Sequence, residues 1–174
     1  MAARTPGRCD FGAALASIAA LLPDDPRIDR LIGLLVARGV AITSTPAVLE
    51  PFDGSEAELA TVADGLQVLA PALRDAVVAG ARERAARRGA AERARERALF
   101  DRMLQLERRF AAAGGLLMLG TDPTGDGHVV PGYGGLRAMQ LLQRAGLPPE
   151  QVVKIASLNG ATYLGRQREI GSVE

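Results

Sequence analysis

Asp122 stands where an apolar run gives way to a turn, and a carboxylate in that place can do chemistry. The run GLLMLG over 115–120 reads as a buried strand, and Thr121 separates it from the aspartate. In parallel α/β folds, functional groups gather at the carboxyl ends of strands. A carboxylate there binds a divalent metal or accepts a proton from a metal-bound water. The alternative is a loop aspartate in an Asx-turn around Pro123, and the local sequence favours neither interpretation.

His128 is the only imidazole of the chain and lies in the glycine-rich loop 123–135. It either contacts a substrate or a metal from this loop, or it is simply solvated. The loop lacks the Gly-Lys-Ser/Thr ending of a P-loop and the glycine spacing of a dinucleotide fingerprint, so we interpret it as a flexible active-site loop. The polar residues 43–45 end an earlier strand and are a further candidate for a pocket wall, although such residues are commonly structural.

Composition limits the sites that the chain can form by itself. Its 174 residues include one cysteine, Cys9, which rules out an internal disulfide and a cysteine-rich zinc site. With one histidine, a zinc site made wholly within the chain would depend on carboxylates, which is unusual for zinc. The arginines of 82–109 are interspersed with acidic residues, which predicts a solvated outer helix and no nucleic-acid partner.

The apolar run 11–22 is too short to span a bilayer, so we expect no membrane-spanning segment. Arg4 and Arg8 precede this run and make a signal peptide the alternative to an amphipathic or buried helix. We favour a helix over 10–22, because the cleavage site of a signal peptide is poorly formed.

The first half of the chain predicts helices around one short strand. Asp24 or Asp25 caps a helix that Gly39 closes, and the β-branched stretch 40–48 reads as a strand. The long segment 55–112 is mostly helical, and Ser55 with Glu58 forms a capping-box pattern. Breaks are expected at Pro71 and Gly89, and Glu83 forms an i,i+4 pair with Arg87.

The second half predicts a strand over 115–120, then a helix that begins near Leu136 and ends at Gly146. Another helix follows Pro148-Pro149, and Asn159-Gly160 is expected to break it. The order of elements is that of an α/β fold with parallel strands. A parallel sheet needs neighbours at its edges and helices on both faces, so we do not expect two strands to be stable by themselves and expect part of the fold to be missing from this chain.

The C-terminal half resembles the end of the metal-dependent amidohydrolase superfamily, closest to its imidazolonepropionase-like and prolidase-like branch. The stretch 34–50 also looks like the segment around the seventh barrel strand of that family. The motifs that carry the resemblance are Gly-Thr-Asp at 120–122, Val-Pro-Gly at 130–132, Ala-Gly-Leu at 145–147, Ala-Ser-Leu-Asn-Gly-Ala at 156–161, Leu-Gly at 164–165 and Ile-Gly-Ser-Val-Glu at 170–174.

The resemblance implies a (β/α)8 TIM barrel with one or two divalent metals, usually zinc. It implies hydrolysis of a C–N bond of amide type, in a small-molecule or dipeptide-like substrate, by a metal-activated water. Asp122 falls on the aspartate that ends the eighth strand, which binds metal and shuttles the proton. The loop after it shapes the substrate pocket in this family, so Thr124 and His128 are candidates for substrate binding.

This chain lacks the family's His-x-His pair and its further histidines, because His128 is its only histidine. We therefore expect 1–174 to be an incomplete C-terminal part of the barrel, helix-rich and inactive alone, with the helical segment 55–112 between its two strands. Unclosed barrel edges would favour association with other chains. The alternatives are a half-enzyme completed by a partner chain and a non-catalytic helical interaction protein that keeps the barrel end as a scaffold.

Overall fold

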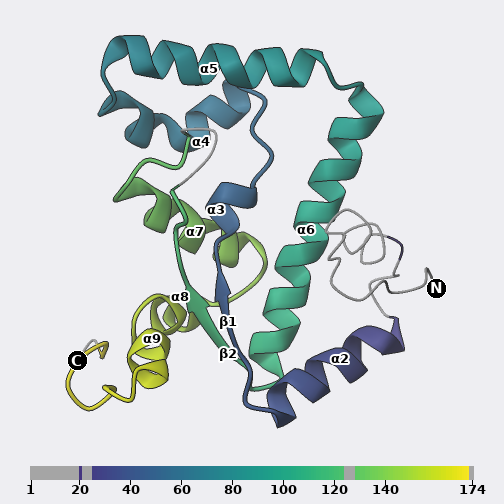
Figure 1. Ribbon diagram of the computed structural model, residues 1–174, viewed down its shortest axis with the longest axis vertical. Helices are drawn as coiled ribbons and strands as arrows, with labels where there is room; N and C mark the ends of the chain where they lie inside the picture. Colours follow the sequence, from purple (N-terminus) through teal and green to yellow (C-terminus); the bar gives the residue numbers. More distant parts are fainter. Residues whose placement is uncertain (1–19, 21–24, 124–127, 173–174) are drawn as a thin grey trace, which may run out of the picture.

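A two-stranded parallel sheet lies at the centre of the chain (Figure 1). The computed structural model describes residues 20, 25–123 and 128–172, so the helix expected over 10–22 falls almost entirely outside the described residues. Strand β1 (Ala41–Ser44) pairs with β2 (Leu116–Leu119), with Ala41 beside Leu116 and Ser44 beside Leu119. The predicted parallel pairing is confirmed, and the fold is a helix-rich α/β arrangement.

The chain enters the sheet through helix α2 (Pro26–Ala37). The Asp25 side chain accepts a hydrogen bond from the Arg27 backbone N–H at 2.8 Å, and Pro26 occupies the first helical position. Ile28 and Ile32 are the buried residues of the helix, one turn apart on the face that packs into the core. The predicted start of this helix is confirmed.

Strand β1 is shorter than predicted, because helix α3 (Pro46–Leu49) follows it at once. The expectation of a strand over 40–48 is therefore wrong beyond Ser44. Pro46 fixes its own φ near the helical value and lacks the N–H that a first helical residue leaves unbonded anyway, so it starts a helix as readily as it ends a strand. The short helix packs against α7 (Tyr133–Arg144).

Three longer helices follow α3 before the second strand: α4 (Glu56–Gln67), α5 (Pro71–Ala86) and α6 (Ala90–Ala112). The breaks expected at Pro71 and Gly89 are confirmed, as is the Glu83–Arg87 ion pair at 2.5 Å. Figure 1 shows α4 and α5 across the top of the molecule and α6 returning alongside the sheet. None of the helices in the described ranges is long and apolar enough to cross a membrane.

The predicted capping box at the start of α4 forms in part. The Ser55 hydroxyl accepts from the Glu58 backbone N–H at 3.4 Å, as the pattern requires. The Glu58 carboxylate, however, accepts from the Asp53 backbone N–H and not from that of Ser55. The Glu58 side chain therefore bonds a backbone N–H two residues earlier in the chain than the capping-box pattern predicts.

After β2 the chain forms α7, α8 (Pro149–Ala156) and α9 (Leu158–Tyr163). Helix α7 begins at Tyr133, three residues before the expected start. The break expected at Asn159-Gly160 is wrong, because both residues lie inside α9 and the chain turns instead at Ser157, which has φ −135° and ψ −77°. The side chain of Asn159 has another use, described below.

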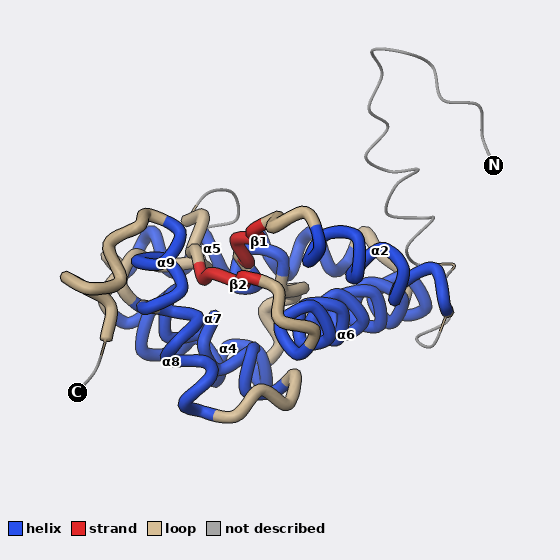
Figure 2. The backbone as a smooth tube through the Cα atoms, turned by 90° about the horizontal axis from the view of Figure 1, so that it is seen from below, coloured by secondary structure: helices blue, strands red, loops and turns tan. Residues whose placement is uncertain are grey.

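The main core lies between the sheet and the helices on one side of it. Figure 2 shows α6, α7 and α8 on the same side of the two strands. The two faces of the sheet differ accordingly: Leu117 on one face is fully buried, whereas Thr43 on the other is exposed. The buried residues of this core are Ile28, Ile32, Phe110, Leu117, Leu142, Leu147, Val152 and Ile155.

Candidate functional site at the carboxyl end of the sheet

Asp122 lies just beyond the carboxyl end of β2, and its side chain is exposed. Its φ of 42° makes it the only non-glycine residue with positive φ among those that the structure describes. Aspartate tolerates this left-handed conformation better than most residues, at a cost of about 1 kcal/mol. Such backbone conformations cluster at functional sites, because the surrounding structure must hold them in place.

The glycine before Thr121-Asp122 lets the two strand ends approach each other. The Gly120 N–H donates to the Ser44 carbonyl at 2.7 Å. A Cβ added at Gly120 would lie 3.0 Å from Cγ2 of Thr43 and 3.2 Å from Cγ2 of Thr45. Close packing against Thr43 and Thr45 thus favours glycine here, at the point where the chain leaves β2 toward Asp122.

Of the polar residues 43–45 that end β1, Ser44 turns inward. Its hydroxyl donates to Glu107 Oε2 of α6 at 2.7 Å, and the serine itself is 2% exposed. Burial raises the pKa of the Glu107 carboxyl, and the hydrogen bond from Ser44 opposes that rise. This pair joins the strand end to the helix layer and was not predicted, because Glu107 reads as one of many charges on a solvated helix.

His128 is buried, so the interpretation of a solvated side chain is wrong. It is 7% exposed and stacks on Phe52, with ring centroids 4.8 Å apart and planes inclined by 17°. Its Nε2 lies 3.3 Å from the Ala47 carbonyl, and because that oxygen can only accept, Nε2 carries the proton in this contact. The ring therefore anchors the loop to the segment after β1. Substrate binding by His128 stays a prediction, and Thr124 lies outside the described residues.

The Asn159 side chain forms a hydrogen bond with the edge of β2 that does not pair with β1. Its Nδ2 donates to the Leu117 carbonyl at 2.7 Å, and the Leu117 N–H donates to the Gly115 carbonyl at 3.0 Å. Both main-chain groups of Leu117 thus have partners other than β1. The expected association through unclosed edges stays a prediction, and at Leu117 another strand would have to displace these bonds.

A complete metal site does not form within the described part of the chain. No group of three His, Cys, Asp or Glu side chains there is arranged to hold a metal ion. Asp122 offers one carboxylate in the expected place, whereas zinc sites in proteins almost always use three or four protein ligands. The described residues therefore do not fit a metal by themselves.

Comparison with known protein families matches residues 33–174 to the model described as the Amidohydrolase family. The matched range includes both strands, Asp122, His128 and Asn159. The comparisons with curated proteins and with solved structures gave no match.

Proposed function

Because this chain belongs to the amidohydrolase family, we propose that it forms the part of a hydrolase barrel that ends in Asp122 and acts on a C–N bond of amide type. The two parallel strands correspond in this proposal to the seventh and eighth strands of the barrel. The substrate is a small molecule or a dipeptide-like compound, as in the imidazolonepropionase-like and prolidase-like branch.

The observation that carries the proposal is the placement of Asp122. Its carboxylate is exposed at the carboxyl end of a parallel strand, on backbone held in a left-handed conformation. The neighbouring strand ends beside it, through the Gly120–Ser44 hydrogen bond. This is the position at which barrel enzymes keep their reacting groups.

The proposed role of Asp122 is proton transfer. The carboxylate accepts a proton from the water whose oxygen attacks the amide carbon. When the C–N bond breaks, Asp122 returns that proton to the leaving nitrogen, so that a carboxylic acid and an amine result. An exposed carboxylate suits this exchange, because it can pass protons to and from solvent.

A divalent metal, zinc in the family's usual form, belongs to the proposal as cofactor of the complete site. The described residues do not fit that site, so we assign no step to the metal. Its other ligands must then come from segments that carry the histidines missing here, in the same or in a separate chain. The 174 residues by themselves are accordingly expected to hydrolyse nothing.

The test compares wild-type and Asp122→Asn forms of the complete enzyme that contains these residues. The release of amine is measured from dipeptides and from cyclic amides. Loss of a positioned general base lowers kcat/KM about 10²- to 10⁴-fold. Asp75→Asn is the matched control, because Asp75 is an exposed aspartate on α5 with its side chain 77% exposed. Near-normal turnover by Asp122→Asn would refute the role of this carboxylate.

A further inference from the structure

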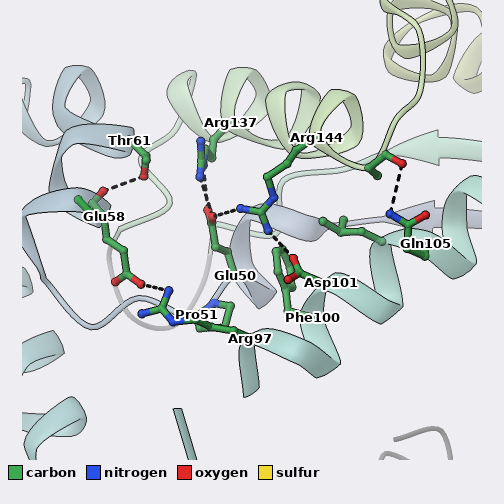
Figure 3. Close-up of a pocket in the computed structure, with 13 residues that line it drawn as sticks. Glu50, Pro51, Glu58, Thr61, Arg97, Phe100, Asp101, Gln105, Arg137 and Arg144 are labelled. Atoms are coloured by element: carbon green, nitrogen blue, oxygen red, sulfur yellow. Dashed lines mark hydrogen bonds and ion pairs between the residues drawn. The ribbon is translucent and has the colours of Figure 1, made fainter. Parts of the chain in front are cut away.

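A groove of about 570 Å³ lies between α4, α6, α7 and the segment that follows α3 (Figure 3). Its apolar floor includes Phe100, Leu104 and Ala145, which are 5%, 1% and 4% exposed. Grooves of this size with an apolar floor and a few converging polar groups are typical of small-molecule sites. No residue of 120–123 lines the groove, so it is separate from the carboxylate of the proposed function.

Two glutamates in the groove already have their charge matched. Glu50 accepts two hydrogen bonds from Arg137, at 2.8 Å from Nε and 2.6 Å from Nη2, and both side chains are largely buried. Glu58 forms an ion pair with Arg97, and burial raises its pKa. These carboxylates therefore present little unbalanced negative charge to a ligand.

Two arginines of the groove have half-exposed side chains, but Arg97 is already paired with Asp53 and Glu58, so only Arg144 can exchange its partner. The side chains of Arg97 and Arg144 are 46% and 49% exposed. Figure 3 shows Arg144 reaching from α7 toward Phe100 and Asp101 of α6. Its guanidinium lies 5.6 Å from the centre of the Phe100 ring, and its Nη2 lies 2.8 Å from Asp101 Oδ1.

The Arg144–Asp101 pair is exchangeable. Asp101 is 63% exposed, and ion pairs between exposed side chains contribute about 0.2–1 kcal/mol. A ligand carboxylate can take the place of Asp101 at little cost, while stacking over Phe100 keeps the guanidinium in position. Asp101 then acts as a built-in competitor for the arginine.

We propose that this groove binds a small organic carboxylate with an apolar body. The carboxylate pairs with Arg144, and the apolar body packs on Phe100, Leu104 and Ala145. An anion with an apolar body suits the groove better than phosphate, because phosphate has no apolar surface to pack on the floor of the groove.

The test titrates the full chain with benzoate, with benzamide as the neutral isostere and inorganic phosphate as the dianion, and follows binding by calorimetry. We expect benzoate to bind more tightly than either comparison compound. Arg144→Gln should lower benzoate affinity about 10-fold, the loss of one charge-assisted contact. Arg166→Gln is the control, because Arg166 pairs with Glu169 at the surface outside the groove, and it should leave affinity unchanged.

Asp101→Asn makes the test independent of whether Arg144→Gln folds. Removing the competing carboxylate should raise benzoate affinity about 2- to 5-fold, which corresponds to the strength of an exposed ion pair. Absence of benzoate binding, equal binding of benzamide, tighter binding of phosphate, or unchanged affinity in Asp101→Asn would each overturn the proposal.

Discussion

The ion pair between Glu50 and Arg137 fastens the end of α3 to α7, and Glu50→Gln tests how much it stabilises the fold. The side chains are 14% and 17% exposed, and two hydrogen bonds join them. Glutamine keeps the size of the side chain and removes its charge. Arg137 then stays largely buried with no carboxylate to balance it.

The expected loss is about 3 kcal/mol of unfolding free energy. Removing one partner of a buried pair leaves an uncompensated charge and costs about 3–5 kcal/mol. The lower end applies because Arg137 keeps some contact with water and donates to Gln140 Oε1 at 3.2 Å. Arg144, whose Nη1 lies 3.6 Å from Glu50 Oε1, loses a second, longer contact.

Urea unfolding followed by circular dichroism measures this loss. With a slope of about 2 kcal/mol/M, the midpoint should fall by about 1.5 M. Glu169→Gln is the matched control: it removes the exposed Arg166–Glu169 pair, 55% and 63% exposed, and should change stability by less than about 0.5 kcal/mol. A loss below about 1 kcal/mol in Glu50→Gln would refute the argument, because the pair would then behave as a surface pair.

Two further predictions concern the packing around α6. The raised pKa of Glu107 means that the folded chain holds this proton more tightly than the unfolded chain, so the contribution to stability is present at low pH and lost as pH rises through the folded pKa. Glu107→Gln should therefore stabilise the chain more at pH 8 than at pH 4, and equal effects in urea titrations at the two pH values would contradict this. In Gly115→Ala, the new Cβ would overlap the ring of buried Phe110. We expect thermal unfolding to show a loss of about 1–3 kcal/mol, and full stability would mean that the ring has room to move.

The helix boundaries that the sequence predicted correctly depend on residues at or next to the boundary itself. Asp25 caps α2 through a bond to a residue two positions away, and Pro71 and Gly89 separate helices by their own backbone preferences. The predictions from Pro46 and from Asn159-Gly160 are wrong, because these residue types occur both at the ends of helices and strands and within or at the start of helices. Tertiary contacts decide there: α3 packs on α7, and Asn159 bonds β2 from within α9.

The sequence predicted only those parts of the candidate site that a single residue and its immediate neighbours identify. Asp122 follows from an apolar run that ends in a carboxylate. The burial of His128 depends on Phe52 and Ala47, the latter 81 residues earlier in the chain, and the Glu50–Arg137 pair joins residues 87 apart. No local pattern relates such residues, because the fold alone brings them together.

The parallel pairing of β1 and β2 also has a consequence for how the chain folds. Ala41 meets Leu116 only after α3, α4, α5 and α6 have been accommodated between them. Closing a loop of this length costs about 4 kcal/mol of chain entropy before any strand contact compensates it. Helices, by contrast, form locally and within microseconds. We therefore expect helix formation to come first and the meeting of the two strands to limit the folding rate, so that a shorter connection in place of α4 and α5 would speed folding.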